Sequence, residues 1–138
     1  MYKIEVRGHF SAAHFLEDYD GLCGSVHGHR WEVVLSLKQP VKSDGMVVDF
    51  HDLKDSLNQI MDEMDHSFIL DPCGNSVSKD LYDFAISHKM RVFEFTGRTT
   101  AENIAKYIYK RIRRDTGYTT HAVTVYEAPG NGVTYSEE

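Results

Sequence analysis

Cysteine is scarce in this chain of 138 residues, and long apolar stretches are missing. The cysteines are Cys23 and Cys73, and no secretion signal accompanies them, which argues against a disulfide framework and for reactive or metal-binding thiols. Residues 1–7 alternate polar with apolar side chains, which argues against a signal peptide or a membrane span. We therefore expect a cytoplasmic protein without a membrane partner.

Basic residues are in the minority. The 15 lysines and arginines are outnumbered by 21 aspartates and glutamates, so the formal net charge is −6. This balance opposes non-specific attraction to nucleic acid and favours a small-molecule partner. With 41% hydrophobic residues the chain can bury a core, and its length predicts a single domain over residues 1–138.

Two segments have the two-residue periodicity of strands. Residues 2–14 place apolar side chains and His14 on one side, and Gly8 marks an expected bulge or bend. Residues 29–38 alternate more regularly, with four apolar side chains on one face: Trp31, Val33, Leu35 and Leu37.

The rest of the chain predicts two helices and three further strands. Asp49 caps a helix with an apolar stripe, and the segment 99–102 fits a capping box for a second helix that ends at Gly117. Residues 71–90 fit either a helix or irregular structure. Strands are expected at three places: 92–95, 121–127 and 133–135. This order predicts an α+β fold, an antiparallel sheet with both helices on one face, whose free edges favour a homo-oligomer.

Three histidines share one strand parity and indicate a metal site. His27 and His29 are separated by one residue, so both imidazoles point to the same side of a strand. His14 has the matching parity on the first strand, and an antiparallel pairing would bring it beside them. Three neutral imidazoles suit Zn²⁺ and leave a fourth position for water or substrate. A chance pair of ordinary half-buried histidines is the alternative.

Four other side chains carry chemistry with more than one interpretation. Cys23 in its glycine-rich loop fits either a fourth zinc ligand or a free thiolate that moves protons. Asp65 next to His66 fits a tautomer-fixing pair, or a helix end whose histidine complements the dipole. Glu127 continues the parity of two valines, so its carboxylate lies at the mouth of an apolar face, where it could accept the paired N–H donors of an amino-heterocycle.

Together these residues resemble a known family, the 6-pyruvoyl- and 6-carboxytetrahydropterin synthases. The resemblance is carried, in the family's order, by six segments: Phe10-Ser11-Ala12-Ala13-His14, 23–29 (CGSVHGH), 45–50 (GMVVDF), Asp65-His66, 100–103 (TAEN) and 125–129 (VYEAP). It implies a tunnelling fold, with an antiparallel four-stranded sheet, two helices on one face, and subunits that form a barrel-like ring, commonly a hexamer, with active sites at the interfaces.

The resemblance also implies roles for the site residues. His14, His27 and His29 would bind zinc, Cys23 would be the proton-transferring thiol, Asp65 and His66 would complete a catalytic relay, and Glu127 would anchor the pterin ring. The three-residue gap between Cys23 and His27 is similar to the bacterial 6-carboxytetrahydropterin synthases of queuosine (7-deazaguanine) biosynthesis. The expected substrate is then 7,8-dihydroneopterin triphosphate, converted to 6-carboxytetrahydropterin, acetaldehyde and triphosphate.

Alternatives stay open within and outside this class. They are a 6-pyruvoyltetrahydropterin synthase, a related pterin aldolase or epimerase, and a non-catalytic protein that binds zinc or pterin. The chain departs from the family pattern at Thr99, where many relatives have proline, and in residues 72–98, which are longer than in the shortest members. We expect neither departure to touch a proposed catalytic group, although the longer segment could reshape the pocket rim or the ring interface.

Overall fold

The computed structural model describes residues 1–137. Its strands are β1 (Tyr2–His14), β2 (His27–Gln39), β3 (Ser67–Leu70), β4 (Val92–Glu94), β5 (Thr120–Ala128) and β6 (Asn131–Tyr135). Its helices are α1 (Phe50–Met64), α2 (Ser76–Ser87) and α3 (Ala101–Thr116), and a short 3₁₀ turn spans Leu22–Gly24. None of these helices is long and apolar enough to cross a membrane.

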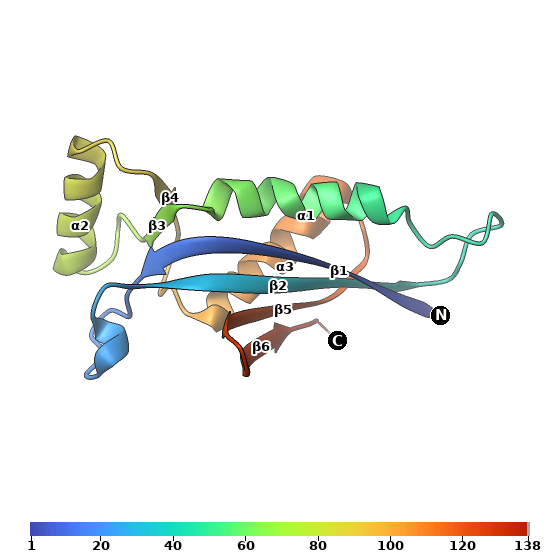
Figure 1. Cartoon of the computed structure of the whole chain (residues 1–138), viewed down its shortest axis with the longest axis horizontal. Helices are drawn as coiled ribbons and strands as arrows, with labels where there is room; N and C mark the ends of the chain where they lie inside the picture. The colour runs from blue at the N-terminus through green and yellow to red at the C-terminus, as the bar shows by residue number, and fades with distance from the viewer. Residues whose placement is uncertain (138) are drawn as a thin grey trace.

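All six strands form one sheet in the order β4-β3-β1-β2-β5-β6. The two long strands β1 and β2 pair antiparallel along their whole length, from Tyr2 opposite Gln39 to His14 opposite His27. Figure 1 shows these strands along the length of the molecule, with the turn between them at the same end as α2. The ends of β1 and β2 that carry the histidines are therefore held together by continuous pairing.

The prediction of a four-stranded antiparallel sheet with two helices is wrong in three respects. The sheet has six strands, β3 pairs parallel with both β1 and β4, and α2 is a third helix. The strand β3 has only four residues and follows α1 after a two-residue turn, so it is too short to show strand periodicity. The α+β class and the expected strand near residues 92–95 are confirmed.

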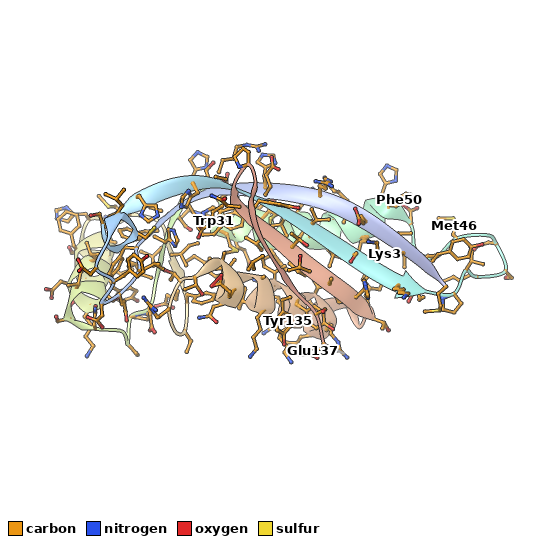
Figure 2. All side chains as sticks on the ribbon, turned by 90° about the horizontal axis from the view of Figure 1, so that it is seen from below. Lys3, Trp31, Met46, Phe50, Tyr135 and Glu137 are labelled. Atoms are coloured by element: carbon orange, nitrogen blue, oxygen red, sulfur yellow. The ribbon has the colours of Figure 1, made fainter. Side chains whose placement is uncertain are left out.

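The predicted packing of the two long helices on one sheet face is confirmed. Buried side chains of α1, α3 and the inner faces of β1, β2 and β5 form one apolar cluster, with Trp31 of β2 fully buried among them. Figure 2 shows the arched strands with the helices on one side and Trp31 labelled within the layer between them. Each fully buried side chain of this size stabilises the fold by about 1.5–3 kcal/mol.

The helix ends follow the predicted signals with one change. Asp49 accepts a hydrogen bond from the His51 amide and caps α1, and Gly117 ends α3 in the left-handed conformation at φ 72°. At the start of α3 the cap is Thr100, whose side chain accepts from the Asn103 amide, so a capping box starting at Thr99 is wrong. Because the first helical hydrogen bond is accepted by Thr100, the carbonyl oxygen of Thr99 lies outside the hydrogen bonds of α3.

Gly8 does not mark a bulge, because the β1–β2 register runs through it without interruption. It lies instead against the side chains of Leu57 and Met61 of α1. A Cβ atom at this position would lie 3.0 Å from Met61 Cγ and 3.1 Å from Leu57 Cδ2. The absence of a side chain lets the helix approach the strand.

Candidate metal centre

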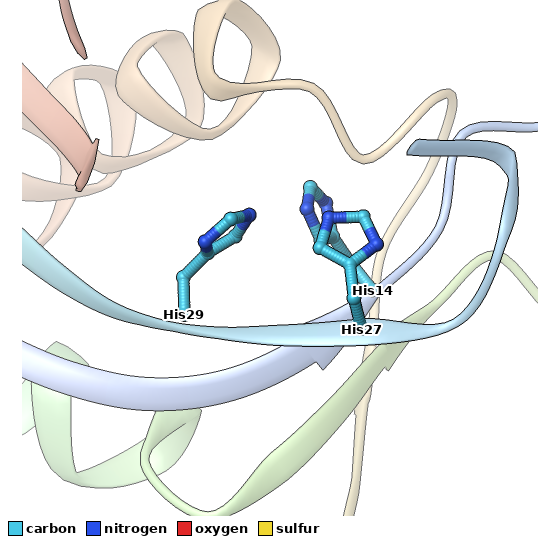
Figure 3. A group of neighbouring side chains, drawn as sticks. All are labelled: His14, His27 and His29. Carbon is cyan, nitrogen blue, oxygen red and sulfur yellow. The ribbon is translucent and has the colours of Figure 1, made fainter. Parts of the chain in front are cut away.

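The paired ends of β1 and β2 bring the three predicted histidines together. His14 lies opposite His27, and His29 lies opposite Ala12, so all three project from the same face of the sheet. One ring nitrogen from each lies within 4.8 Å of the others, and this is the only group of three or more metal-ligating side chains within residues 1–137. Figure 3 shows the rings converging on one space. The prediction that an antiparallel pairing gathers them is confirmed.

Hydrogen bonds orient two of the three rings. The Nδ1 atoms of His14 and His27 lie 2.7 Å from the backbone carbonyl oxygens of Thr99 and Ser25. Because a carbonyl oxygen only accepts, each Nδ1 carries the proton and each Nε2 keeps a lone pair. A second hydrogen-bonding partner of this kind is usual for metal-binding histidines.

Two of the inward nitrogens have no hydrogen-bond partner within residues 1–137. Nε2 of His14 and Nε2 of His29 are buried and make no hydrogen bond. A buried polar atom without a partner costs about 1–3 kcal/mol, so such atoms are rare unless a water, an ion or a ligand satisfies them. The donor set is three imidazoles, which suits Zn²⁺ with one position open. The residues present therefore fit a metal ion.

Burial keeps the imidazoles in the form that binds metal. The pKa of His14 falls from 6.5 to about 4, mainly because burial removes water from the charged ring, although the Thr99 carbonyl opposes this change. Burial likewise lowers the pKa of His29, against the attraction of the Glu127 carboxylate. Both rings are therefore neutral at pH 7 and can donate their lone pairs to a cation.

Trp31 forms the floor beneath these rings. Its indole meets His14 and His29 edge to face, with ring centroids 4.8 Å and 5.3 Å apart. The indole Nε1–H donates to the Ala12 carbonyl oxygen at 3.3 Å, which fixes the ring. The ligands thus rest on a rigid, dry surface, which restricts the rotamers that they can adopt.

Glu127 lies beside the histidines, as its parity predicts. Its Oε2 atom is 4.0 Å from His29 Nε2, and the β5–β6 register shifts between Tyr126 and Ala128, so Glu127 occupies an irregularity. Such irregularities re-aim a side chain. Glu127 also lines a cavity of about 300 Å³ between the start of α3 and the β5–β6 hairpin.

That cavity adds residues to which the sequence assigned no role in binding. Its walls include Thr100 and Glu102 at the first turn of α3 and Asn131 at the start of β6. The volume lies at the small end of the range for pockets that hold organic ligands. Two carboxylates in one small hollow favour a ligand with several N–H or O–H donors. The family motif at 100–103 could have indicated these residues. Its place at the start of a helix suggested capping and not ligand binding.

Comparisons with known proteins agree on one family. Residues 3–138 match the model of the family described as 6-pyruvoyl tetrahydropterin synthase. The 6-carboxy-5,6,7,8-tetrahydropterin synthase of Haemophilus influenzae is 32% identical, with 99% of this chain and 100% of the relative covered. The chain belongs to the 6-pyruvoyl tetrahydropterin synthase family. The expected resemblance is confirmed.

Solved structures of the family share the fold. The 6-pyruvoyl tetrahydropterin synthase of Caenorhabditis elegans matches with a TM-score of 0.73 and 26% identity, over 99% of this chain and 96% of that one. The enzyme of the same name from Plasmodium vivax matches with a TM-score of 0.76 and 21% identity, over 100% and 99%. The six-stranded mixed sheet with three helices is thus the architecture of a tetrahydropterin synthase.

The expected catalytic residues, Cys23 and the Asp65–His66 pair, are not part of the histidine group. Cys23 is exposed in the 3₁₀ turn between β1 and β2, and its thiol is not among the three clustered ligand atoms. The turn is anchored by the Leu16 amide, which donates to the Cys23 carbonyl oxygen at 2.8 Å. The thiol therefore stands in a loop beside the metal-binding strands without belonging to the ligand set.

Asp65 and His66 form a hydrogen-bonded pair. His66 Nδ1 lies 2.7 Å from Asp65 Oδ2, and the other carboxylate oxygen accepts from the Ser11 amide at 2.7 Å. These bonds, with the Ser11 amide first, hold the pKa of Asp65 below its usual value. The His66 ring is exposed. Within one chain the pair has the geometry of an oriented imidazole, and the histidine group does not include it.

Thr99, where the chain departs from the family pattern, contacts a candidate metal ligand through its backbone and not through its side chain. Its backbone carbonyl oxygen accepts from the ring of His14, and its hydroxyl donates to the Phe15 carbonyl oxygen at 3.0 Å. A backbone oxygen is present whatever the side chain, so no residue preference reveals this contact. Thr99 thus belongs to the shell around the ligands.

Proposed function

We propose that this member of the family is a zinc-dependent 6-carboxy-5,6,7,8-tetrahydropterin synthase of queuosine (7-deazaguanine) biosynthesis. Its substrate is 7,8-dihydroneopterin triphosphate, which with one water gives 6-carboxytetrahydropterin, acetaldehyde and triphosphate. One observation carries the proposal. Two buried, partnerless imidazole nitrogens face the same space as a carboxylate that lines an adjacent cavity.

The three histidines hold the zinc ion. When bound, Zn²⁺ supplies Lewis-acid polarisation of oxygen atoms on the substrate side chain. The Thr99 and Ser25 carbonyl oxygens orient the rings of His14 and His27, and Trp31 excludes water below them. His14, His27 and His29 would supply three ligands to a zinc ion and so leave one position for the substrate side chain.

Glu127 and the cavity hold the pterin ring. A carboxylate accepts two parallel N–H bonds, which is the pattern of the 2-amino group and a ring N–H in a pterin. Because Glu127 Oε2 lies 4.0 Å from a ligand nitrogen, a ring held there directs its side chain toward the metal site. Positioning of this kind supplies a large part of a rate enhancement.

Cys23 and the Asp65–His66 pair move the protons. A thiolate can remove a proton from carbon, and an imidazole oriented by a carboxylate can return one to oxygen or carbon. The two groups stand on different parts of the chain, and His66 is exposed. We therefore place the complete site at the interface of a homo-oligomer, in line with the hexameric rings expected for the family.

Product analysis tests the proposed reaction. The zinc-loaded protein is incubated with 7,8-dihydroneopterin triphosphate, and the pterins are identified by mass spectrometry. We expect 6-carboxytetrahydropterin, and no product after removal of the metal with a chelator. A pyruvoyl product would favour the alternative synthase instead. Unchanged substrate with zinc and pterin both bound would leave a non-catalytic binding protein.

Glu127→Gln tests the pterin anchor in the same assay. The amide keeps the shape but turns one acceptor into a donor, so we expect KM to rise by about tenfold or more. Glu32→Gln is the matched control, since this exposed carboxylate pairs with Arg30 on the other face of β2. An unchanged KM for Glu127→Gln would remove the anchor from the proposal.

Cys23→Ala separates the two roles of the thiol. As a proton carrier, Cys23 is dispensable for metal binding, so the variant should retain one zinc per chain and lose turnover. Cys73→Ala is the control, because Cys73 is also an exposed free cysteine. Loss of zinc in Cys23→Ala would make the thiol a ligand.

A further inference from the structure

The C-terminal end of α1 carries charge of the wrong sign for a helix end. No basic residue lies in its last turn, and the acidic residues Asp62 and Glu63 are followed by Asp65 at the cap. The carbonyl oxygens there already form the negative pole of the helix dipole. A cation from elsewhere in the chain is therefore needed at the point where the Asp65–His66 pair begins.

Arg91 is the cation that reaches the carbonyl oxygens there, while the side chain of Glu63 pairs with Arg111 of α3. Its Nε donates to the Asp65 carbonyl oxygen at 2.9 Å, and one terminal nitrogen donates to the carbonyl oxygens of Asp62 (2.5 Å) and Glu63 (3.2 Å). Its own carbonyl oxygen accepts from the Phe68 amide at 2.9 Å, which ties Arg91 to β3. One guanidinium thus donates hydrogen bonds to three carbonyl oxygens at the end of the helix, including that of Asp65 itself.

The pair is also held by β1. Ser11 donates its amide to the Asp65 carboxylate, and its carbonyl oxygen accepts from the His66 amide at 2.6 Å. His66 has a positive φ of 57°, a conformation that non-glycine residues rarely adopt and that the surroundings must enforce. Ser11 thus bonds both residues of the pair, and Arg91 bonds the carbonyl oxygen of Asp65, the residue directly before the left-handed position.

We infer that Arg91 is a positioning residue for the Asp65–His66 pair, holding the left-handed turn that aims the His66 ring while Asp65 orients it. The inference rests on the proposed function, because it gives the pair its role in proton transfer. It assigns a task to residues 72–98, the segment that is longer here than in the shortest relatives. Arg91 itself does not touch the substrate.

The contacts require an arginine. Nε of the planar guanidinium reaches the carbonyl oxygen of the cap residue Asp65, and a terminal nitrogen reaches that of Asp62 in the last turn. A lysine ammonium on a flexible stem cannot fix that plane. Because the side chain is exposed, these bonds add little to global stability. Loss of Arg91 should therefore loosen the turn without unfolding the protein.

Steady-state kinetics of zinc-loaded Arg91→Ala, with the triphosphate substrate, tests the inference. We expect kcat to fall by about 10- to 100-fold, the range for a small misplacement of a reacting group, with KM and zinc content unchanged. Arg91→Lys should not restore kcat. Arg114→Ala is the control, since this exposed arginine pairs only with its neighbour Asp115, at the far end of α3.

A spectroscopic measurement gives a readout besides activity. Nitrogen-15 NMR of the His66 ring should show the proton on Nδ1 in the wild-type protein, where Asp65 accepts it, and a mixture of tautomers in Arg91→Ala. The ring signal of the Arg114→Ala control should match the wild type. If Arg91→Ala does not accumulate as folded protein, Arg91→Lys is measured with the same readouts.

The outcomes separate the inference from the proposed function. Should His66→Ala turn over like the wild type, the relay is wrong and the inference falls with it. Should His66→Ala be inactive while Arg91→Ala keeps wild-type kcat and tautomer, only the inference is overturned; wild-type behaviour of Arg91→Lys in every readout overturns it as well. The double variant Arg91→Ala/His66→Ala gives a further test. A kcat no lower than that of His66→Ala supports the inference, and losses of kcat that add up contradict it.

Discussion

At the scale of single residues, His14 is the most constrained part of the metal centre. It lies 1% exposed against Trp31, with one ring nitrogen bonded to a backbone carbonyl and the other buried without a partner. A ring in this position gains nothing from a proton, since burial penalises the charged form. Its chemistry is that of a neutral metal ligand.

This constraint predicts the pH dependence of the metal-free protein. The pKa of His14 is about 4 in the folded state and 6.5 in the unfolded state, so the unfolded chain binds more protons between these values. Stability is therefore full above pH 6.5 and falls as pH drops toward 4, by on the order of 3 kcal/mol from this residue. Urea titrations at pH 7, 5.5 and 4.5 measure the change.

The comparison variant is His14→Gln. It removes the titrating ring and should flatten the dependence of the unfolding free energy on pH. Identical slopes for wild type and His14→Gln would show that His14 titrates normally.

At the scale of elements, the contact between α1 and β1 decides how the sheet is covered. Gly8→Val should destabilise the protein by about 1–3 kcal/mol, because the added atoms would overlap Leu57 and Met61 of α1. Thermal or urea unfolding measures this loss. Gly28→Ala is the matched glycine control, since its Cβ would meet one atom, the Ala12 carbonyl oxygen, at an ordinary 3.7 Å. Equal stability of the two variants would contradict the close approach.

The same scale shows which elements a sequence reveals. The strands β1 and β2 are 13 residues long, so their alternation predicts both the elements and the shared face of the three histidines. The helix α2 escaped a clear prediction because its buried positions include Ser78 while Val77 and Phe84 are exposed, the reverse of an amphipathic pattern. Parallel pairing of β3 depends on where the chain returns after α1, which periodicity does not encode.

The surroundings of the site could not be predicted for a different reason. The Thr99 contact with His14 comes from a backbone oxygen, and the Arg91 contacts join a side chain to backbone groups 26 to 29 residues away. Neither involves a residue type that sequence spacing marks. The ligands themselves were predictable because metal binding needs particular side chains at a particular parity.

At the scale of the whole molecule, the separated parts of the site and the edges of the sheet favour an oligomer. The strands β4 and β6 end the sheet, each with a single partner within residues 1–137. The thiol and the Asp65–His66 pair stand outside the histidine group. A ring of subunits would pair edges and complete the sites together.

This arrangement predicts complementation between inactive variants. Cys23→Ala and His66→Ala should each be inactive and elute as hexamers in size-exclusion chromatography with light scattering. After dissociation and reassembly together, the mixture should regain turnover, because some interfaces then combine an intact thiol with an intact imidazole. A mixed hexamer that stays inactive would place both groups in one chain's site.

We propose that three imidazoles hold a catalytic zinc ion and leave one coordination position for the substrate. X-ray absorption spectroscopy at the zinc edge of the loaded protein measures this ligand set. We expect three nitrogen ligands at about 2.0–2.1 Å and one oxygen, with the oxygen shell changing when a pterin binds. A sulfur ligand at about 2.3 Å would contradict it, since Cys23 would then close the site and leave no position for the substrate.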